Sequence, residues 1–179
     1  MNLIDLNNTV AAVTGGSSGI GLATVELLLQ GGAAVAFCGR DEKRLRDAEE
    51  KLRAQFPDAR LFAATCNVLD AADVQRFAES SERALGAASI LVNNAGQGRV
   101  STFADTEDSA WTEELHLKFF SVIYPTRAFL PQLRRQAAPA IVCVNSLLAA
   151  QPEPHMVADR KSTRLNSSHI QKSRMPSSA

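Results

Sequence analysis

Cysteine is scarce in this chain, and its spacing excludes two classes of protein. The three cysteines, Cys38, Cys66 and Cys143, lie far apart and are odd in number, so they match neither a disulfide framework nor a metal-ligand cluster. Each falls at a segment that we expect to be a strand. We therefore expect small buried thiols in a reducing compartment, and no metal site.

Long apolar runs and an excess of charge are lacking as well. No stretch reaches the length of a transmembrane helix, and Asp5 interrupts the first apolar residues, where a signal peptide would be continuous. Five basic residues and one acid fall within residues 159–179, so residues 1–158 carry a net charge of about −4. That balance offers no basic patch to nucleic acid. We expect a cytoplasmic protein that binds neither membrane nor nucleic acid.

The end of the chain differs from the rest. Residues 159–169, DRKSTRLNSSH, are the direct translation of a common high-throughput sequencing adapter, and residues 173–179, SRMPSSA, translate a later part of the same adapter. The alternative is a natural, serine-rich disordered tail. We interpret residues 159–179 as an artefactual, disordered tail and confine fold reasoning to residues 1–158, which are enough for one domain with a sizeable core.

Glycines gather in the most informative segment of the chain. Residues 10–21, VAAVTGGSSGIG, join an apolar strand to a helix, in which Ile20, Ala23 and Leu27 repeat at helical spacing. Bare N–H groups and the positive dipole end favour an anion at a helix N-terminus, and glycines let a diphosphate come close. A tight turn needing positive φ is the alternative. The segment predicts a phosphate cradle made of Gly15, Ser17, Ser18, Gly19, Ile20 and Gly21.

Strands and helices alternate along the chain. We expect strands at residues 10–13, 34–38, 61–66, 89–92 and 140–144, with helices between them that include 41–56, 72–85 and 107–135. This alternation predicts an α/β fold, a Rossmann-like doubly wound parallel sheet that binds ligands at the carboxyl ends of its strands. In the last helix we expect a kink at Pro125 and a buried stripe of Trp111, Leu115, Phe119 and Val122.

Three motifs at the ends of these strands carry a family resemblance. The glycine segment comes first, Asn93-Asn94-Ala95-Gly96 ends the fourth strand, and Ser146 follows the fifth. In this order they resemble the classical short-chain dehydrogenase/reductase family, over about residues 3–158. The resemblance implies a nicotinamide-dependent oxidoreductase with one Rossmann domain. Because the family's domain is longer, we expect a chain cut short after the fifth strand, from a parent protein that is a homo-oligomer.

Arg40 follows the second strand, where an acidic residue would bind the ribose 2′-hydroxyl of NAD. A guanidinium offers a planar, charged fork to the 2′-phosphate of NADP instead. The alternative is a solvated residue that opens the next helix. NADP is therefore the expected cofactor, with NAD the less favoured one.

Other cofactor contacts are implied by the resemblance. Asn67 and Val68 match the place where the family contacts the adenine, although a simple turn would also explain them. Asn93 is implied as a cofactor-side contact that also braces the sheet. Ala95 and Gly96 are implied as the place where the backbone approaches the ribose.

The resemblance implies a catalytic role for Ser146, whose hydroxyl would hydrogen-bond the substrate carbonyl or the developing oxyanion. A serine in a turn at a strand end is the alternative. The family's general acid or base, a tyrosine, is expected about thirteen residues later, at Asp159 in the adapter-like segment, and its lysine four residues beyond that. Tyr124, the one tyrosine of the chain, is expected to be a packing residue.

Lys118 departs from the family pattern, which usually has an asparagine about seven residues after the helix tryptophan. It either takes over a proton-transfer role, marks a branch with altered chemistry, or is a solvated helix residue. We include Lys118 with Ser146 as a candidate catalytic residue.

The sequence thus predicts a parent protein that interconverts a carbonyl and a secondary alcohol by hydride transfer with NADP. The alternative is a non-catalytic dinucleotide-binding sensor or scaffold of the same fold, and the residue at the missing tyrosine position would decide between them. The chain as given is expected to be inactive. It should also be poorly soluble, since a sheet edge and a sheet face remain uncovered.

Overall fold

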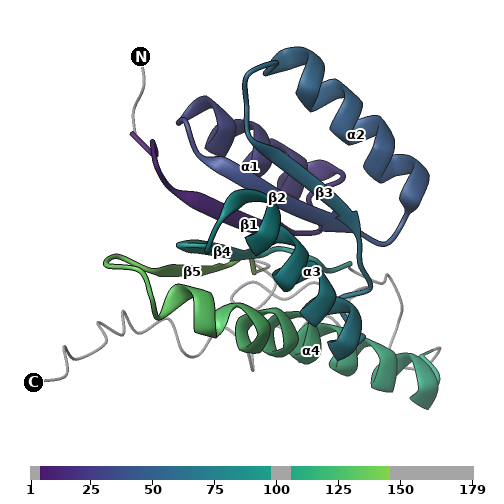
Figure 1. The fold of residues 1–179 in the computed structure, drawn as a ribbon. Helices are drawn as coiled ribbons and strands as arrows, with labels where there is room; N and C mark the ends of the chain where they lie inside the picture. The colour runs from purple at the N-terminus through teal and green to yellow at the C-terminus, as the bar shows by residue number, and fades with distance from the viewer. Residues whose placement is uncertain (1–4, 98–105, 146–179) are drawn as a thin grey trace, which may run out of the picture. The chain divides into compact units, whose positions relative to one another are not determined.

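The chain folds around one parallel sheet whose strands follow the order β3-β2-β1-β4-β5. A computed structural model describes residues 5–97 and 106–145 (Figure 1). The strands are β1 (Val10–Thr14), β2 (Ala34–Gly39), β3 (Leu61–Thr65), β4 (Ile90–Asn93) and β5 (Ala140–Cys143). The helices are α1 (Gly19–Gln30), α2 (Glu42–Gln55), α3 (Ala71–Leu85) and α4 (Asp108–Leu133). The direction of winding reverses between β1 and β4, which confirms the expected Rossmann-like fold.

Side chains alternate between the two faces of the sheet, as they must in a pleated strand. In β2, Val35 and Phe37 join a core cluster with residues of α1 and α2, whereas Ala36 and Cys38 join a cluster with residues of α3 and α4. Helices therefore cover both faces. This is why the central strands read as continuous apolar runs and not as alternating ones.

The chain forms two compact units by its contacts. The first comprises residues 1–97 and 119–144 and holds the whole sheet. The second comprises residues 98–118 and 145–179, of which the structure describes residues 106–118 and Asn145. None of the described helices is both long and apolar enough to cross a membrane.

The buried face of α1 does not follow the apolar spacing noted in the sequence. Ile20 and Leu27 are 67% and 66% exposed, and the residues that α1 buries are Gly21, Val25 and Leu29. This helix is apolar on almost every side, so apolar spacing alone could not select the face that meets the sheet. The apolar residues that repeat at helical spacing in the sequence, Ile20, Ala23 and Leu27, are therefore not the ones that α1 buries.

The expected stripe of α4 was also displaced. Leu115 is exposed, and Trp111, Phe119 and Val122 are only half-buried. The buried positions of this helix include polar side chains; they are Ala110, Glu114, Leu117, Ser121, Pro125, Phe129, Gln132 and Leu133. Gln132 is buried because its amide accepts from Ala88 N–H at 2.9 Å and donates to the Ala78 carbonyl at 2.9 Å. The helix continues through both Pro125 and Pro131.

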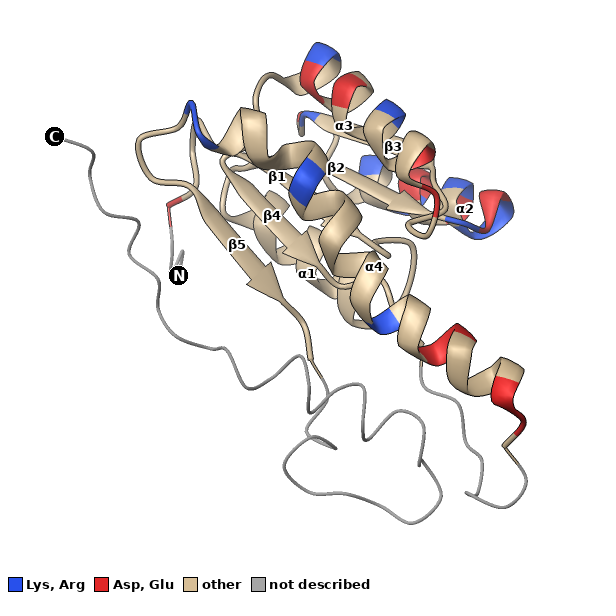
Figure 2. Cartoon of the chain, turned by 90° about the horizontal axis from the view of Figure 1, so that it is seen from below, with Lys and Arg blue, Asp and Glu red and all other residues tan. Residues whose placement is uncertain are grey.

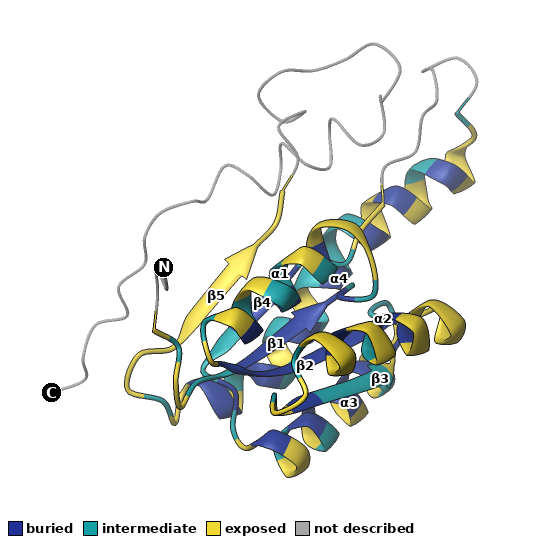
Figure 3. Cartoon of the chain, turned by 90° about the horizontal axis from the view of Figure 1, so that it is seen from above, coloured by how far each residue is buried: buried dark blue, intermediate teal, exposed yellow. Residues whose placement is uncertain are grey.

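β5 lies at one edge of the sheet, paired with β4 on its inner side. All four of its residues are exposed, in contrast to the buried β1 (Figure 3). Cys143 is therefore exposed, whereas Cys38 and Cys66 are buried. The expectation of a buried thiol was correct for two cysteines and wrong for Cys143, because no described helix covers this edge strand.

Charged residues of both signs lie along α2 and α3 (Figure 2). Arg53 pairs with Glu49 at 2.7 Å and Arg76 with Asp73 at 2.8 Å. The surfaces of these two helices therefore carry charges of both signs.

Candidate cofactor site at the carboxyl ends of the strands

The turn from β1 into α1, residues 15–21 (the glycine loop), depends on its glycines in two different ways. Gly15 and Gly19 have φ of +67° and +54°, in the left-handed region that side chains disfavour. Gly21 is required for close packing instead, because a β-carbon there would collide with the carbonyl oxygen of Gly15. A β-carbon at Gly16 would lie 2.7 Å from that of Phe37 in β2. The loop is thus tightly fitted to the sheet.

The helix α1 begins at Gly19, within this loop. The first N–H groups of a helix have no acceptor within the helix, and Ser18, at the N-cap position, does not supply one from its side chain. A β-carbon added at Gly19 would meet no atom within 4 Å, so there is open space beside these N–H groups. The arrangement can accept a phosphate group close to the backbone.

Asn94 and Thr14 tie this loop to the end of β4. The Asn94 amide donates to the carbonyls of Thr14 and Gly15 at 3.0 and 3.1 Å. The Thr14 hydroxyl accepts from the N–H groups of Asn94 and Ala95, both at 3.1 Å. Thr14 belongs to the glycine segment and Asn94 to the Asn-Asn-Ala-Gly motif, but the sequence does not reveal these bonds. The backbone of Ala95 and Gly96 is thereby held beside the glycine loop.

The side chain of Asn93 points away from this loop, to the other face of the sheet. It is 3% exposed, and its amide donates to the Thr126 hydroxyl of α4 at 3.1 Å and approaches the Cys143 sulfur of β5 at 3.8 Å. Its side chain therefore links β4 to α4 and β5. Any contact of Asn93 with a cofactor stays a prediction.

Arg40 extends from the end of β2 towards the end of β4. Its Nη2 donates to Oε1 of Gln97 at 2.8 Å. Because β1 lies between β2 and β4, this bond spans the carboxyl end of β1. Ser17 packs against Gly39, the residue before Arg40, since a β-carbon at Gly39 would lie 2.6 Å from the Ser17 hydroxyl oxygen. Gln97 was not among the candidate residues, and nothing in its local sequence distinguishes it.

Asn67 and Val68 follow β3 in a turn. The Asn67 N–H donates to Asp73 at 2.7 Å, and its side-chain oxygen accepts from Leu69 N–H at 3.1 Å. Val68 packs against the core cluster beneath the sheet. Asn67 lies at the same carboxyl end of the sheet as Arg40, because β2 and β3 are parallel and Gly39 is paired with Thr65.

Of the two candidate catalytic residues, the structure describes Lys118 alone. Ser146 lies outside the described residues. Lys118 is half-buried on α4, in the second compact unit, whereas the glycine loop belongs to the first. Tyr124 packs against the core cluster, with its ring 4.9 Å from that of Phe120, in keeping with a packing residue.

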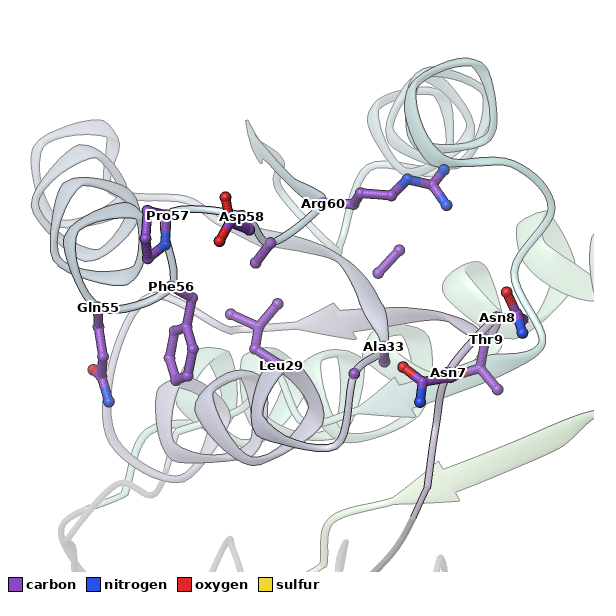
Figure 4. A pocket seen from close by; sticks show the side chains of 13 residues that line it. Asn7, Asn8, Thr9, Leu29, Ala33, Gln55, Phe56, Pro57, Asp58 and Arg60 are labelled. Atoms are coloured by element: carbon purple, nitrogen blue, oxygen red, sulfur yellow. The ribbon is translucent and has the colours of Figure 1, made fainter. Parts of the chain in front are cut away.

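A separate groove of about 550 Å³ lies at the amino ends of the strands, opposite the glycine loop (Figure 4). Its lining includes Thr9, Ala34 and Arg60, which stand at the amino ends of β1, β2 and β3. Leu29 and Phe56, which pack in the same core cluster, lie next to each other in its lining. None of the candidate cofactor residues lines this groove, so it is a different feature from the glycine loop.

Comparison with known proteins identifies the family. The short chain dehydrogenase family model matches residues 9–158. This chain belongs to the short-chain dehydrogenase family. Within that family of oxidoreductases, it is 30% identical over 149 residues to the 3alpha-hydroxysteroid dehydrogenase of Mediterraneibacter gnavus, covering 83% of this chain and 60% of that protein.

Two solved structures extend the comparison. The chain is 70% identical to a short-chain oxidoreductase from Pseudomonas aeruginosa PAO1, described as NADPH-bound and as containing an atypical catalytic center; the TM-score is 0.89, and 91% of this chain and 63% of that chain are covered. It is 26% identical to a short-chain dehydrogenase/reductase from Burkholderia phymatum in complex with NAD, with a TM-score of 0.82 and coverage of 90% and 57%. This chain thus spans about three fifths of the length of the relatives it matches. Its relatives bind nicotinamide dinucleotides of both kinds.

Proposed function

We propose that this chain is the NADP-binding part of an oxidoreductase that interconverts a carbonyl and a secondary alcohol. The observation that carries the proposal is the placement of Arg40 beside the glycine loop, with its guanidinium over the end of β1. A fixed positive charge there favours the 2′-phosphate that distinguishes NADP from NAD. The NADPH bound to the Pseudomonas protein, at 70% identity, supports the same choice.

The residues present fit such a cofactor. The open space at Gly19 and the uncapped start of α1 would hold the pyrophosphate, with Ser17, Ser18, Ile20 and Gly21 around it. Arg40 and Ser17 would hold the 2′-phosphate, and Asn67 and Val68 the adenine. Ala95 and Gly96 would lie along the ribose, where Asn93 contributes its backbone. The bound cofactor supplies or accepts the hydride.

Two residues are proposed for the chemical step. The Ser146 hydroxyl would hydrogen-bond the substrate oxygen, and Lys118 would hold or move a proton in place of the family's usual asparagine. The atypical catalytic center named for the Pseudomonas protein supports a departure of this kind. By family analogy we also propose a small carbonyl or alcohol as substrate, a cytoplasmic location and a homo-oligomeric state, with neither nucleic acid nor a membrane as partner.

Titration of the full-length protein with NADPH and with NADH tests the proposal. We expect tighter binding of NADPH, and we expect the variant Arg40→Ala to lose about tenfold to a hundredfold in NADPH affinity while NADH affinity changes little. A matched control is Arg83→Ala, since Arg83 lies on the exposed side of α3 and bonds to Ser80. Equal affinity for the two dinucleotides in the wild-type protein would refute the NADP assignment.

Turnover separates the enzyme from the sensor or scaffold. We expect the full-length protein to oxidise NADPH in the presence of small ketones or aldehydes. We expect Lys118→Ala to lower kcat while the KM for NADPH changes little. Tight NADPH binding without turnover across a broad panel of carbonyls and alcohols would favour the non-catalytic function.

A further inference from the structure

Gln97 accepts a hydrogen bond from Arg40 across the carboxyl end of β1. Within the described part of the chain this is the one polar contact of the Arg40 side chain, with Nη2 and Oε1 2.8 Å apart. The two residues are 57 positions apart, and they come from strands that flank β1 on opposite sides. The bond therefore depends on the fold and not on local sequence.

The chemistry of this bond suits a positioning role. Arginine has five N–H donors in a rigid fork, so the bond to Gln97 leaves four of them for an anion. The acceptor is an uncharged amide oxygen on an exposed side chain, which orients the guanidinium without cancelling its charge. Holding a long side chain in one place before binding lowers the entropy lost when a ligand binds.

We propose that Gln97 positions the Arg40 guanidinium and thereby helps to set the preference for NADP over NAD. This inference rests on the proposed function, in which Arg40 binds the 2′-phosphate. Gln97 acts through Arg40 and is a positioning residue. The neutral amide is essential to this role, because a carboxylate at the same place would pair with Arg40 and repel the 2′-phosphate.

Two substitutions distinguish positioning from a general structural role. Gln97→Ala removes the acceptor, and we expect NADPH affinity to fall about threefold to tenfold with NADH affinity unchanged. Gln97→Glu keeps the size and an acceptor but adds a charge. We expect it to weaken NADPH binding about tenfold or more, and the loss should shrink at high salt. In steady-state kinetics, both variants should raise the KM for NADPH and leave kcat unchanged.

A double-mutant cycle tests the dependence on Arg40. In an Arg40→Ala background, Gln97→Ala should have no further effect on the ratio of NADPH to NADH affinity. The control is Gln75→Ala, an exposed glutamine on α3 that bonds to Glu79 at 2.9 Å. It should leave both affinities unchanged. Thermal unfolding of every variant verifies that the fold is retained.

The outcomes separate this inference from the proposed function. If the wild-type protein shows no preference for NADPH, the NADP assignment itself fails. If the wild-type protein prefers NADPH through Arg40, but the Gln97 variants change both affinities equally or not at all, only the role of Gln97 is overturned.

Discussion

The side-chain amide of Asn94, at the end of β4, lies 3.1 Å from the carbonyl oxygen of Gly15, in the loop after β1. The same Nδ2 is 3.0 Å from the carbonyl of Thr14, so one side chain closes the start of the glycine loop onto the neighbouring strand. We expect Asn94→Ala to lower the free energy of unfolding by about 1–2 kcal/mol, the worth of two partly buried hydrogen bonds. Urea denaturation of the full-length protein measures this loss.

The variant Asn94→Asp tests the direction of these bonds. Its carboxylate can only accept, and it would face two carbonyl oxygens. We expect a larger loss of stability than with Asn94→Ala, together with weaker NADPH binding because the glycine loop is displaced. Gln75→Ala, which removes an exposed amide, serves as the control. An Asn94→Asp protein as stable as the wild type would show that the amide does not donate as described.

Gly21 and Gly19 allow the packing of the loop to be separated from its binding role. A methyl group at Gly21 collides with the Gly15 carbonyl, so Gly21→Ala should destabilise the protein by about 2–3 kcal/mol. A methyl group at Gly19 meets no atom within 4 Å but requires a φ of +54°. Its cost should be about 1 kcal/mol, with NADPH binding lost because the methyl occupies the phosphate space. Unfolding curves and NADPH titration of both variants check this contrast; equal destabilisation would contradict it.

The positions of β1 and β2 could be predicted because these central strands are buried on both faces. Such strands read as unbroken apolar runs, and the runs at residues 10–13 and 34–38 each fall within one residue of β1 and β2. The faces of the helices were harder. On α1 nearly every position is apolar, and on α4 the buried face includes Ser121 and Gln132, so the apolar pattern favoured the neighbouring stripe.

The site could be predicted only where its chemistry is local. The glycines of residues 15–21 and the arginine after β2 are recognisable from neighbouring residues. The bonds of Asn94 to Gly15 and of Arg40 to Gln97 join residues 79 and 57 positions apart, and they depend on which strands lie side by side. No short-range pattern contains that information, which is why Gln97 was missed.

Asp41 caps the N-terminus of α2, where its side chain accepts from Arg44 N–H at 2.9 Å. That bond is the main reason why the pKa of Asp41 is lowered from its usual 3.8. A lowered folded-state pKa means that this contribution to stability is present above pH 3.8 and is lost as the pH falls below it. We expect Asp41→Asn, whose amide oxygen can still cap the helix, to show a weaker loss of stability in acid than the wild type. Acid titration followed by circular dichroism measures the difference, with Asp47→Asn on the same helix as the control; identical acid limbs for wild type and Asp41→Asn would contradict the role.

Cys38 and Cys66 lie together on the face of the sheet beneath α3, both buried in the same core cluster. The hydrogen bond with Cys66 and then burial raise the pKa of the Cys38 thiol well above its usual 9.0. Because the thiolate is the reactive form, iodoacetamide at about pH 8 should modify Cys143 in the native protein and reach Cys38 only after unfolding.

The raised folded-state pKa of Cys38 also makes stability depend on pH. The contribution of the protonated thiol to the free energy of unfolding is full below pH 9.0 and declines as the pH rises above it. Cys38→Ala should be less stable than the wild type near neutral pH because it removes a fully buried side chain. It should lose less stability above pH 9.0 because it lacks the thiol, while Cys143→Ala should follow the wild-type curve. Mass spectrometry of the labelled peptides and urea denaturation across this pH range test both statements, and rapid native-state labelling of Cys38 would show that the thiol is neither buried nor held protonated.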